Sequence, residues 1–139
     1  MQKIVVDTNV FVSALIQKSF PYLILKELFV NPQIKFCISD ELFSEYYQVL
    51  NRNKFAKYPD FIDNASNLLT EIKTKSLRFN PQVCLTIIND LDDNKLLELA
   101  DESKANFLIT GNTNDFTMQK YKRTKIVSPK EYWEKHLPK

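Results

Sequence analysis

Short apolar runs alternate along the chain with longer segments whose apolar residues recur every three or four positions. The short runs are rich in β-branched residues, which favour buried strands, and they lie at 3–6, 34–38, 107–110 and 125–127. The longer segments have the spacing of one-sided helices, and they lie at about 10–15, 21–30, 40–50, 61–75 and 93–103. Residues 81–88 are expected to be irregular or a short strand, and Pro129 to start a final helical turn. Strands that alternate with helices predict an α/β fold, a single domain over residues 1–139 with a mostly parallel sheet covered on both faces.

Several helix boundaries follow from residues that favour helix starts. Pro21 suits a first helical turn, where its missing N–H has no partner to lose. Ser39 or Asp40 is expected to cap the helix after the second strand, and Asp92 or Asp93 to open the helix that reaches residue 103.

Polar residues directly follow two of the expected strands. Ile4-Val5-Val6 runs into Asp7-Thr8-Asn9, and the run 107–110 leads into Gly111-Asn112-Thr113-Asn114-Asp115. In open α/β sheets, binding sites form just outside the carboxyl ends of the strands. Both polar segments are therefore expected to face a crevice.

Further acids lie on the expected helices. Glu45 lies beside an apolar helix face, which suits a boundary residue as well as a functional one. Capping accounts for one of Asp90, Asp92 and Asp93, but three acids in four positions repel one another unless they are solvated or neutralised by a cation. Asp7, directly after a buried strand, needs a hydrogen-bonding network or a metal. Acids from separate strand and helix ends, with no histidine near them, suggest a hard-cation site.

The chain contains a single glycine, Gly111. A Walker A loop and a dinucleotide-binding fingerprint each need at least two spaced glycines, so both are excluded. Gly111 is expected to supply a positive φ or to allow close backbone approach, with an ordinary tight turn as the alternative.

The net charge of +2 is too small to identify a partner, but basic residues are clustered. Two clusters surround aromatic side chains: Lys120, Lys122, Arg123 and Lys125 around Tyr121, and Arg52, Lys54 and Lys57 around Phe55 and Tyr58. Such clusters either contact phosphates or form an ordinary solvated surface.

The two cysteines, Cys37 and Cys84, fit neither a disulfide framework nor a zinc motif. Both are expected to be buried free thiols in a reducing compartment. The N-terminal segment lacks the apolar region of a signal peptide, and no apolar run is long enough to span a bilayer. We therefore expect a cytoplasmic protein without a membrane partner.

Five blocks, in their order and spacing, resemble the PIN-domain family, especially the VapC-type toxins of bacterial toxin–antitoxin modules. The blocks are residues 4–15, 39–50, 90–100, 107–112 and 128–132. The resemblance implies a three-layer α/β/α fold and metal-dependent hydrolysis of RNA by a toxin that an antitoxin holds in check.

By position, the resemblance implies that Asp7, Glu45 and Asp93 are the three core acids. Asp93 is preferred over Asp92 because the family pattern places a leucine three residues and an alanine seven residues after the acid. The residues expected to support these acids are Thr8, Asn9, Asp92 and Asn112.

The chain departs from the family pattern at two places. Many relatives have an aspartate directly after Thr-Gly, where this chain has Asn112, while others have asparagine there and an Asp-Phe pair like Asp115-Phe116. We therefore expect Asp115 to supply the fourth charge, and Asn112 to hydrogen-bond another acid or a water of the ion. The second departure is Lys104-Ala105, where relatives often have glycine after the helix.

Oxygen ligands without histidine favour Mg²⁺ or Mn²⁺ over zinc. Carboxylates do not titrate near neutral pH in water, so a water activated by the cation is the expected nucleophile. The prediction is a metal-dependent endoribonuclease with RNA as substrate and an antitoxin as partner, with a homodimer left open. The basic residues expected to contact RNA are Arg52, Lys54, Lys120, Lys122 and Arg123.

Two alternatives remain open from the sequence. One is a degenerate PIN domain, with its metal affinity lost at Asn112, that binds RNA or a partner protein without cleaving it. The other is a phosphatase or phosphotransfer domain, which usually needs a second aspartate at the position of Asn9.

Overall fold

The computed structural model describes residues 1–82, 84, 91–113, 116 and 118–138. Its strands are β1 (Gln2–Val6), β2 (Ile34–Ile38), β3 (Leu77–Arg78), β4 (Phe107–Ile109), β5 (Lys120–Tyr121) and β6 (Thr124–Val127). Its helices are α1 (Thr8–Ile16), α2 (Phe20–Leu28), α3 (Asp40–Leu50), α4 (Phe61–Lys75), α5 (Leu91–Ser103) and α6 (Pro129–Glu131). Two short helical turns complete the set, η1 (Asn53–Phe55) and η3 (Tyr132–His136).

The strands form one sheet in the order β3-β2-β1-β4-β6-β5. All neighbouring pairs are parallel except β5 and β6, which form an antiparallel hairpin. The central strand β1 ends in three residues, Ile4, Val5 and Val6, that are fully buried. Successive residues of a strand point to opposite faces, so this run requires cover on both sides of the sheet.

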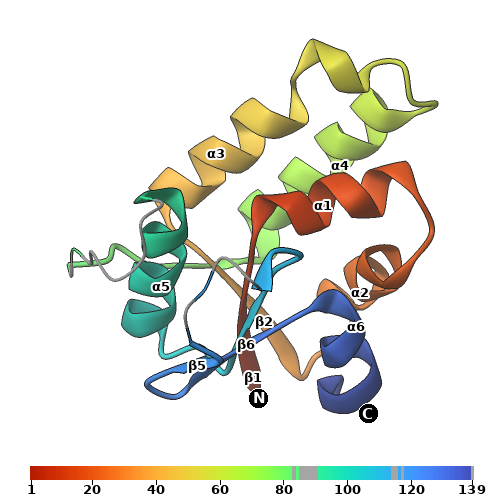
Figure 1. The fold of residues 1–139 in the computed structure, drawn as a ribbon. Coiled ribbons are helices and arrows are strands. Elements are labelled where there is room, and N and C mark those ends of the chain that lie inside the picture. Colours follow the sequence, from red (N-terminus) through yellow and green to blue (C-terminus); the bar gives the residue numbers. More distant parts are fainter. Residues whose placement is uncertain (83, 85–90, 114–115, 117, 139) are drawn as a thin grey trace.

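Helices supply that cover and make three layers (Figure 1). Helix α5 packs against β1, β2 and β4 on one face, and α1, α2 and α6 lie on the other. Helices α3 and α4 pack against each other and against α1, beyond the carboxyl end of β1. The predicted three-layer α/β/α fold with a mostly parallel sheet is confirmed. Within the described residues, every helix is too short or too polar to cross a membrane.

Most of the predicted elements are present close to their predicted bounds. The strand at 34–38 and the helix at 61–75 match residue for residue, and the first helix is longer than predicted at both ends. Ser39 caps α3, since its hydroxyl accepts a hydrogen bond from the N–H of Leu42 at 3.1 Å. Most of residues 81–88 lie outside the described residues, so that expectation stays open.

Three short elements were not predicted: β3, β5 and η1. Each spans only two or three residues, which is too short to display a period of apolar positions. They form where a neighbouring element holds them, as β3 pairs with the end of β2 and β5 pairs with β6.

The two cysteines have different environments. Cys37 is buried on β2, as predicted, and burial raises the pKa of its thiol to about 11. Cys84 is exposed, so the prediction of a second buried thiol was wrong. The expectation rested on the general tendency of free cysteines to be buried, which does not depend on the position in the chain.

Lys104 ends α5 in a conformation that usually belongs to glycine. Its φ is 57°, its N–H donates to the carbonyl of Asp101 at 3.3 Å, and the N–H of Ala105 donates to the carbonyl of Ala100 at 3.0 Å. This pair of hydrogen bonds is the Schellman motif, which satisfies the last free carbonyls of a helix. A side chain at this position costs energy because its Cβ crowds the following carbonyl oxygen.

Replacing Lys104 by glycine should therefore stabilise the fold. We expect the Lys104→Gly variant to gain about 1 kcal/mol in the free energy of unfolding, measured by urea denaturation. Glu102→Gly, two residues earlier in the helical part of α5, should lose about 1 kcal/mol in the same assay. Loss of stability in both variants would contradict the strain at Lys104.

Candidate active site

The carboxyl ends of the central strands bring three polar residues to one edge of the sheet: Asp7 after β1, Thr110 after β4 and Ser128 after β6. The register pairs Val6 with Ile109 and Ile109 with Val127, so the residues that follow each strand lie side by side. The N–H of Asp7 donates to the carbonyl of Ile109 at 2.9 Å, and the N–H of Thr110 donates to the carbonyl of Val127 at 3.0 Å. This is the edge at which the sequence predicted a crevice.

The Asp7 carboxylate is turned toward β4. Asp7 is the residue before α1, but its side chain makes no capping hydrogen bond to that helix. Its Oδ2 instead accepts a hydrogen bond from the hydroxyl of Thr110 at 2.8 Å. The same hydroxyl accepts from the N–H of Asn112 at 3.1 Å, so the buried Thr110 is held on both sides. Asp7 is thus positioned by a residue 103 positions away in the chain.

Glu45 reaches the same edge from α3. The neighbouring Tyr46 is fully buried, and its hydroxyl donates to the carbonyl of Val6 at the end of β1. The Tyr46 ring packs edge-on against Phe11 of α1, with ring centroids 5.0 Å apart. The Thr8 hydroxyl then donates to Oε2 of Glu45. These contacts hold α3 against the sheet, so that Glu45 lies beside Asp7.

The two carboxylates affect each other electrostatically. Burial raises the pKa of the Asp7 carboxyl above its ordinary value, and the charge of Glu45 raises it further. The Thr110 hydroxyl and nearby backbone N–H groups oppose this shift without cancelling it. Burial, Asp7 and Glu45 also raise the pKa of Tyr46, which keeps its hydroxyl protonated as a donor. Two repelling acids in a sheltered site are the arrangement that a bound cation would relieve.

Asp93 lies in the first turn of α5, where it is buried. An ion pair between Lys95 and Glu41, 3.7 Å apart, joins this end of α5 to the start of α3. Among the described residues, however, no three acids, histidines or cysteines form a group that could hold a metal ion. The structure therefore brings Asp7 and Glu45 together, and the convergence of Asp93 with them stays a prediction.

Some predicted site residues cannot be placed. Asp90 and Asp115, and the side chain of Asp92, lie outside the described residues. Asn112 is placed, and it contributes its backbone N–H to Thr110. Its side chain is exposed, so its expected contact with another acid stays a prediction.

Asn9, in the first turn of α1, contacts the turn that follows β4. Its Oδ1 accepts a hydrogen bond from the N–H of Gly111 at 3.3 Å. Gly111 does not have a positive φ, so that expectation was wrong. A Cβ built at Gly111 would meet the Asn9 side chain at 3.5 Å, an ordinary contact, so close approach does not require glycine either. Gly111 belongs to an ordinary turn.

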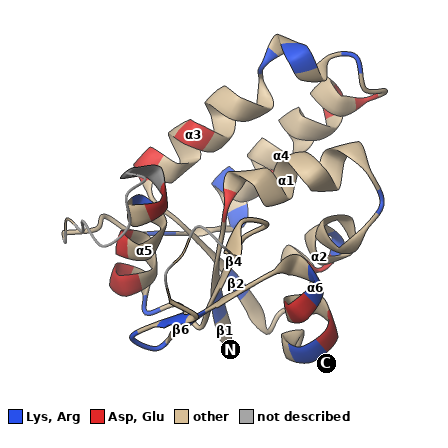
Figure 2. Ribbon diagram, viewed as in Figure 1, with Lys and Arg blue, Asp and Glu red and all other residues tan. Residues whose placement is uncertain are grey.

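The predicted basic residues lie at two separate places. Arg52 lines a polar hollow together with Glu45 and Lys95, and Lys54 is exposed on the η1 turn that follows α3. The other cluster lies on the β5–β6 hairpin at the opposite edge of the sheet (Figure 2). Of these residues, Arg52 is the one that lines a hollow together with Glu45.

The donor chemistry fits a hard divalent cation. The described part of the site offers carboxylate, hydroxyl and amide oxygens from Asp7, Glu45, Thr8 and Asn9. The single histidine, His136, lies in η3, with its Nε2 3.4 Å from Glu131 and its ring packed on Phe107. Oxygen-only donor sets suit Mg²⁺ or Mn²⁺ better than zinc.

Sequence reasoning missed two residues that position the acids, Thr110 and Tyr46. Thr110 was assigned to the strand, although a polar residue at a strand end beside the Asp7 edge was a usable signal. Tyr46 was assigned to the apolar face of its helix, where its ring does lie. The pattern of apolar positions carries no sign that its hydroxyl would reach Val6, because that contact depends on the tertiary packing.

Comparison with known proteins agrees with this geometry. The family model described as the PIN domain matches residues 3–114. An uncharacterised protein of Methanocaldococcus jannaschii, MJ1680, is 32% identical, and the alignment covers 95% of this chain and 90% of that protein. The chain belongs to the PIN-domain family.

A solved structure shares the fold at lower identity. It is the crystal structure of VapBC2 from Rickettsia felis bound to a DNA fragment from its promoter. The match covers 91% of this chain and 98% of the matched chain, with a TM-score of 0.54 and 18% identity. At that identity, the likeness concerns the fold.

The raised pKa of Asp7 predicts how stability depends on pH. A carboxyl whose pKa is higher in the folded state destabilises the fold once pH rises above its unfolded value, about 3.9. Asp7→Asn should therefore raise the melting temperature of the metal-free protein by a few degrees at pH 7, and the gain should vanish near pH 3. Asp63→Asn, on the exposed face of α4, is the matched control and should give no such rise. A lower melting temperature for Asp7→Asn at pH 7 would contradict the repulsion at the site.

Proposed function

We propose that the protein is a divalent-cation-dependent ribonuclease that acts as the toxin of a toxin–antitoxin module. The observation that carries the proposal is the Asp7–Glu45 pair, two repelling carboxylates held at the carboxyl edge of the sheet in a PIN-family chain. When two neighbouring acids have a purely structural role, an adjacent arginine or lysine ordinarily neutralises their charge. The described contacts of both acids are instead with threonine hydroxyls, which leave their charge intact.

The proposed ligands of the cation, Mg²⁺ or Mn²⁺, are Asp7, Glu45 and Asp93, with Asp115 as the fourth acid. When bound, the cation would lower the pKa of water and stabilise the charge that develops on the phosphate. The proposed supporting residues are Thr8, Asn9, Asp92 and Asn112, of which Thr8 already donates to Glu45.

The chain's own residues have distinct parts in this proposal. Thr110 fixes the orientation of Asp7, and Tyr46 fixes α3 and therefore Glu45. Arg52, which lines the same hollow as Glu45, supports a role in holding the phosphates of an RNA near the acids, and the same role is proposed for the exposed Lys54. Positioned charges of this kind are preorganised, so they need not rearrange when the reaction occurs.

Asn112 favours a second candidate, a PIN domain that binds RNA without cleaving it. An amide is a weaker ligand for a hard cation than a carboxylate, and the side chain of Asn112 is exposed. The two candidates differ in their affinity for Mg²⁺. A bound ion stabilises the folded protein, so the melting temperature measured with and without Mg²⁺ distinguishes them.

Removing charge from either acid should abolish cleavage. We expect Asp7→Asn and Glu45→Gln to reduce Mg²⁺-dependent RNA cleavage by at least about 10²-fold while the fold survives. Glu41→Gln is the matched control, because Glu41 lies on the same helix and hollow but pairs with Lys95. Mg²⁺ should also raise the melting temperature of the wild type more than that of either acid variant. A wild-type protein that Mg²⁺ neither activates nor stabilises would support the non-cleaving candidate.

The role of Asp115 needs its own test. If Asp115 supplies charge to the site, Asp115→Asn should raise the Mg²⁺ concentration needed for half-maximal cleavage and leave the melting temperature almost unchanged. A loss of about 1 kcal/mol in stability with unaltered metal dependence would instead indicate a helix-capping role.

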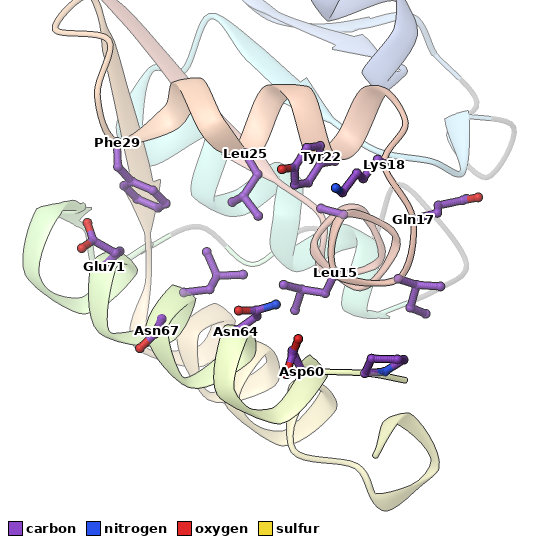
Figure 3. A pocket seen from close by; sticks show the side chains of 14 residues that line it. Leu15, Gln17, Lys18, Tyr22, Leu25, Phe29, Asp60, Asn64, Asn67 and Glu71 are labelled. Carbon is purple, nitrogen blue, oxygen red and sulfur yellow. The ribbon is translucent and has the colours of Figure 1, made fainter. Parts of the chain in front are cut away.

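A groove on the face of α1, α2 and α4 suits the proposed antitoxin (Figure 3). It has a volume of about 660 Å³, and the apolar side chains that line it include Leu15, Leu25 and Leu68. Polar side chains of α4, among them Asn64 and Asn67, form its rim. The structural relative is a VapBC2 protein from Rickettsia felis bound to DNA, and apolar helices commonly dock in grooves of this kind. We assign the groove to an apolar segment of the antitoxin.

A bulky charge on the rim should weaken that complex. We expect Asn67→Arg to lower the affinity for the antitoxin encoded beside the gene by at least about 10-fold, measured by titration calorimetry. The neighbouring Ser66→Arg is the matched control, since Ser66 is exposed on α4 and does not line the groove. Equal affinities for both variants would exclude this groove as the docking site.

A further inference from the structure

Five exposed basic residues gather where the β5–β6 hairpin meets the carboxyl end of α5. We call this cluster the basic edge, and it consists of Lys104, Lys120, Lys122, Arg123 and Lys125. They line two adjoining shallow hollows, and both Lys120 and Arg123 line each of them. A single acid, Asp101, is part of the lining described for these hollows. The cluster therefore has a strong net positive charge in a chain whose overall charge is only +2.

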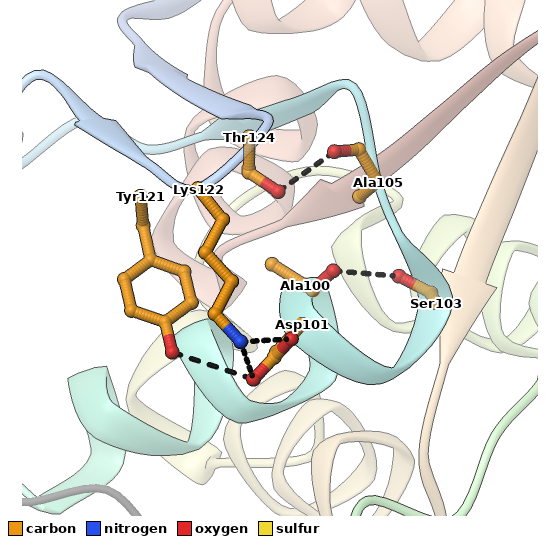
Figure 4. A network of polar contacts seen from close by, with 7 residues as sticks. All are labelled: Ala100, Asp101, Ser103, Ala105, Tyr121, Lys122 and Thr124. Atoms are coloured by element: carbon orange, nitrogen blue, oxygen red, sulfur yellow. Dashed lines mark hydrogen bonds and ion pairs between the residues drawn. The ribbon is translucent and has the colours of Figure 1, made fainter.

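The hairpin that carries the basic edge is fastened to α5 (Figure 4). The Lys122 Nζ lies 3.0 and 3.1 Å from the two carboxylate oxygens of Asp101, and the Tyr121 hydroxyl donates to the same carboxylate at 3.3 Å. The Thr124 hydroxyl donates to the carbonyl of Ala105 at 2.7 Å. The charge of Lys122 is thus paired with Asp101, and this ion pair holds the hairpin against α5.

The remaining four cations are not neutralised in this way. Among the described residues, no ion pair joins Lys104, Lys120, Arg123 or Lys125 to an acid. Their charge is therefore free to meet an anion, on a hairpin that is already ordered. Preorganisation of this kind reduces the entropy cost of binding.

Two of the four lysines occupy strained backbone positions. Lys104 has φ 57° and Lys122 has φ 52°, in the left-handed region where glycine or asparagine costs least. The Lys122 side chain is accounted for by its ion pair with Asp101, whereas none of the ion pairs among the described residues involves Lys104.

The basic edge lies away from the candidate active site. Lys125 pairs with Phe107, which pairs with Ile4, and Asp7 lies three residues further along β1. At about 3.3 Å per residue, Lys125 and Asp7 are therefore at least roughly 10 Å apart along the strand direction. The turn of the hairpin lies beyond the start of β6, further from Asp7. One phosphate cannot contact both places, whereas a chain of several nucleotides can.

We propose that the basic edge binds the phosphate backbone of RNA several nucleotides away from the bond that is cleaved. This inference rests on the proposed ribonuclease function for the identity of the bound molecule. A row of cations across two adjoining hollows complements the regularly repeated charges of a nucleic acid, and such contacts do not depend on base sequence. Lys120 and Arg123, shared by both hollows, are its centre.

Binding tests the inference without any need for cleavage. The variant Lys120→Gln/Arg123→Gln/Lys125→Gln should bind a long single-stranded RNA more weakly than the wild type, in EDTA. Three lost phosphate contacts should reduce the slope of log affinity against log salt by about 2. The control Lys26→Gln/Lys73→Gln/Lys130→Gln removes the same charge from exposed sites outside the cluster, and should keep the slope. Equal losses in both triple variants would overturn the inference, since net charge alone would then explain them.

Lys104→Gly separates binding from stability. This variant should bind long RNA more weakly although its fold is more stable, and a purely structural role predicts unchanged RNA affinity. Unchanged affinity would remove Lys104 from the proposed surface.

Cleavage links the basic edge to the substrate. The triple variant should have a several-fold higher KM for long RNA, an unchanged kcat, and wild-type kinetics on a dinucleotide, whose single phosphate cannot contact both places. An unaltered KM for long RNA would overturn the assignment to the substrate. If the wild type cleaves no RNA, the proposed function fails, while the salt dependence still decides whether the basic edge binds nucleic acid.

Discussion

Repulsion between Asp7 and Glu45 is the constraint that the rest of the site has to overcome. The position is electrostatically unfavourable for the Asp7 carboxylate, since burial and the charge of Glu45 both favour the protonated form of Asp7. Both acids are held there by forces unrelated to their charge. The fully buried Tyr46 locks α3 to the end of β1 through its hydroxyl, and its ring packs against Phe11. The apolar core therefore supplies the free energy that keeps an electrostatically unfavourable pair in place.

Much of this arrangement could be predicted from the sequence because it follows local rules. A run of β-branched residues that ends in Asp7 fixes both a strand and the edge where the acid lies. Ser39 was identifiable as a cap because its side chain acts on a backbone group three residues away. The order of strands and helices was equally accessible, since alternation itself selects a parallel sheet.

What could not be predicted depends on contacts between distant parts of the chain. Thr110 and Asp7 are brought together only by the pairing of β4 with β1. At Gly111 the sequence left a special backbone and an ordinary turn open, and the structure has the ordinary turn. Lys104 was predictable only in part. The family pattern indicated a helix end near it, and the structure shows the strained φ that follows from having no glycine there.

The two outermost strands, β3 and β5, are each only two residues long. They carry Arg78 and Lys120, charged residues on strands that leave backbone groups unpaired on one side. Long, flat, apolar edges are templates on which a second chain can add a strand, and proteins avoid this by keeping edges short and charged. The sheet is thus protected at both margins against growth into aggregates. Short, charged outer strands consequently disfavour the joining of two copies of this chain through their sheets.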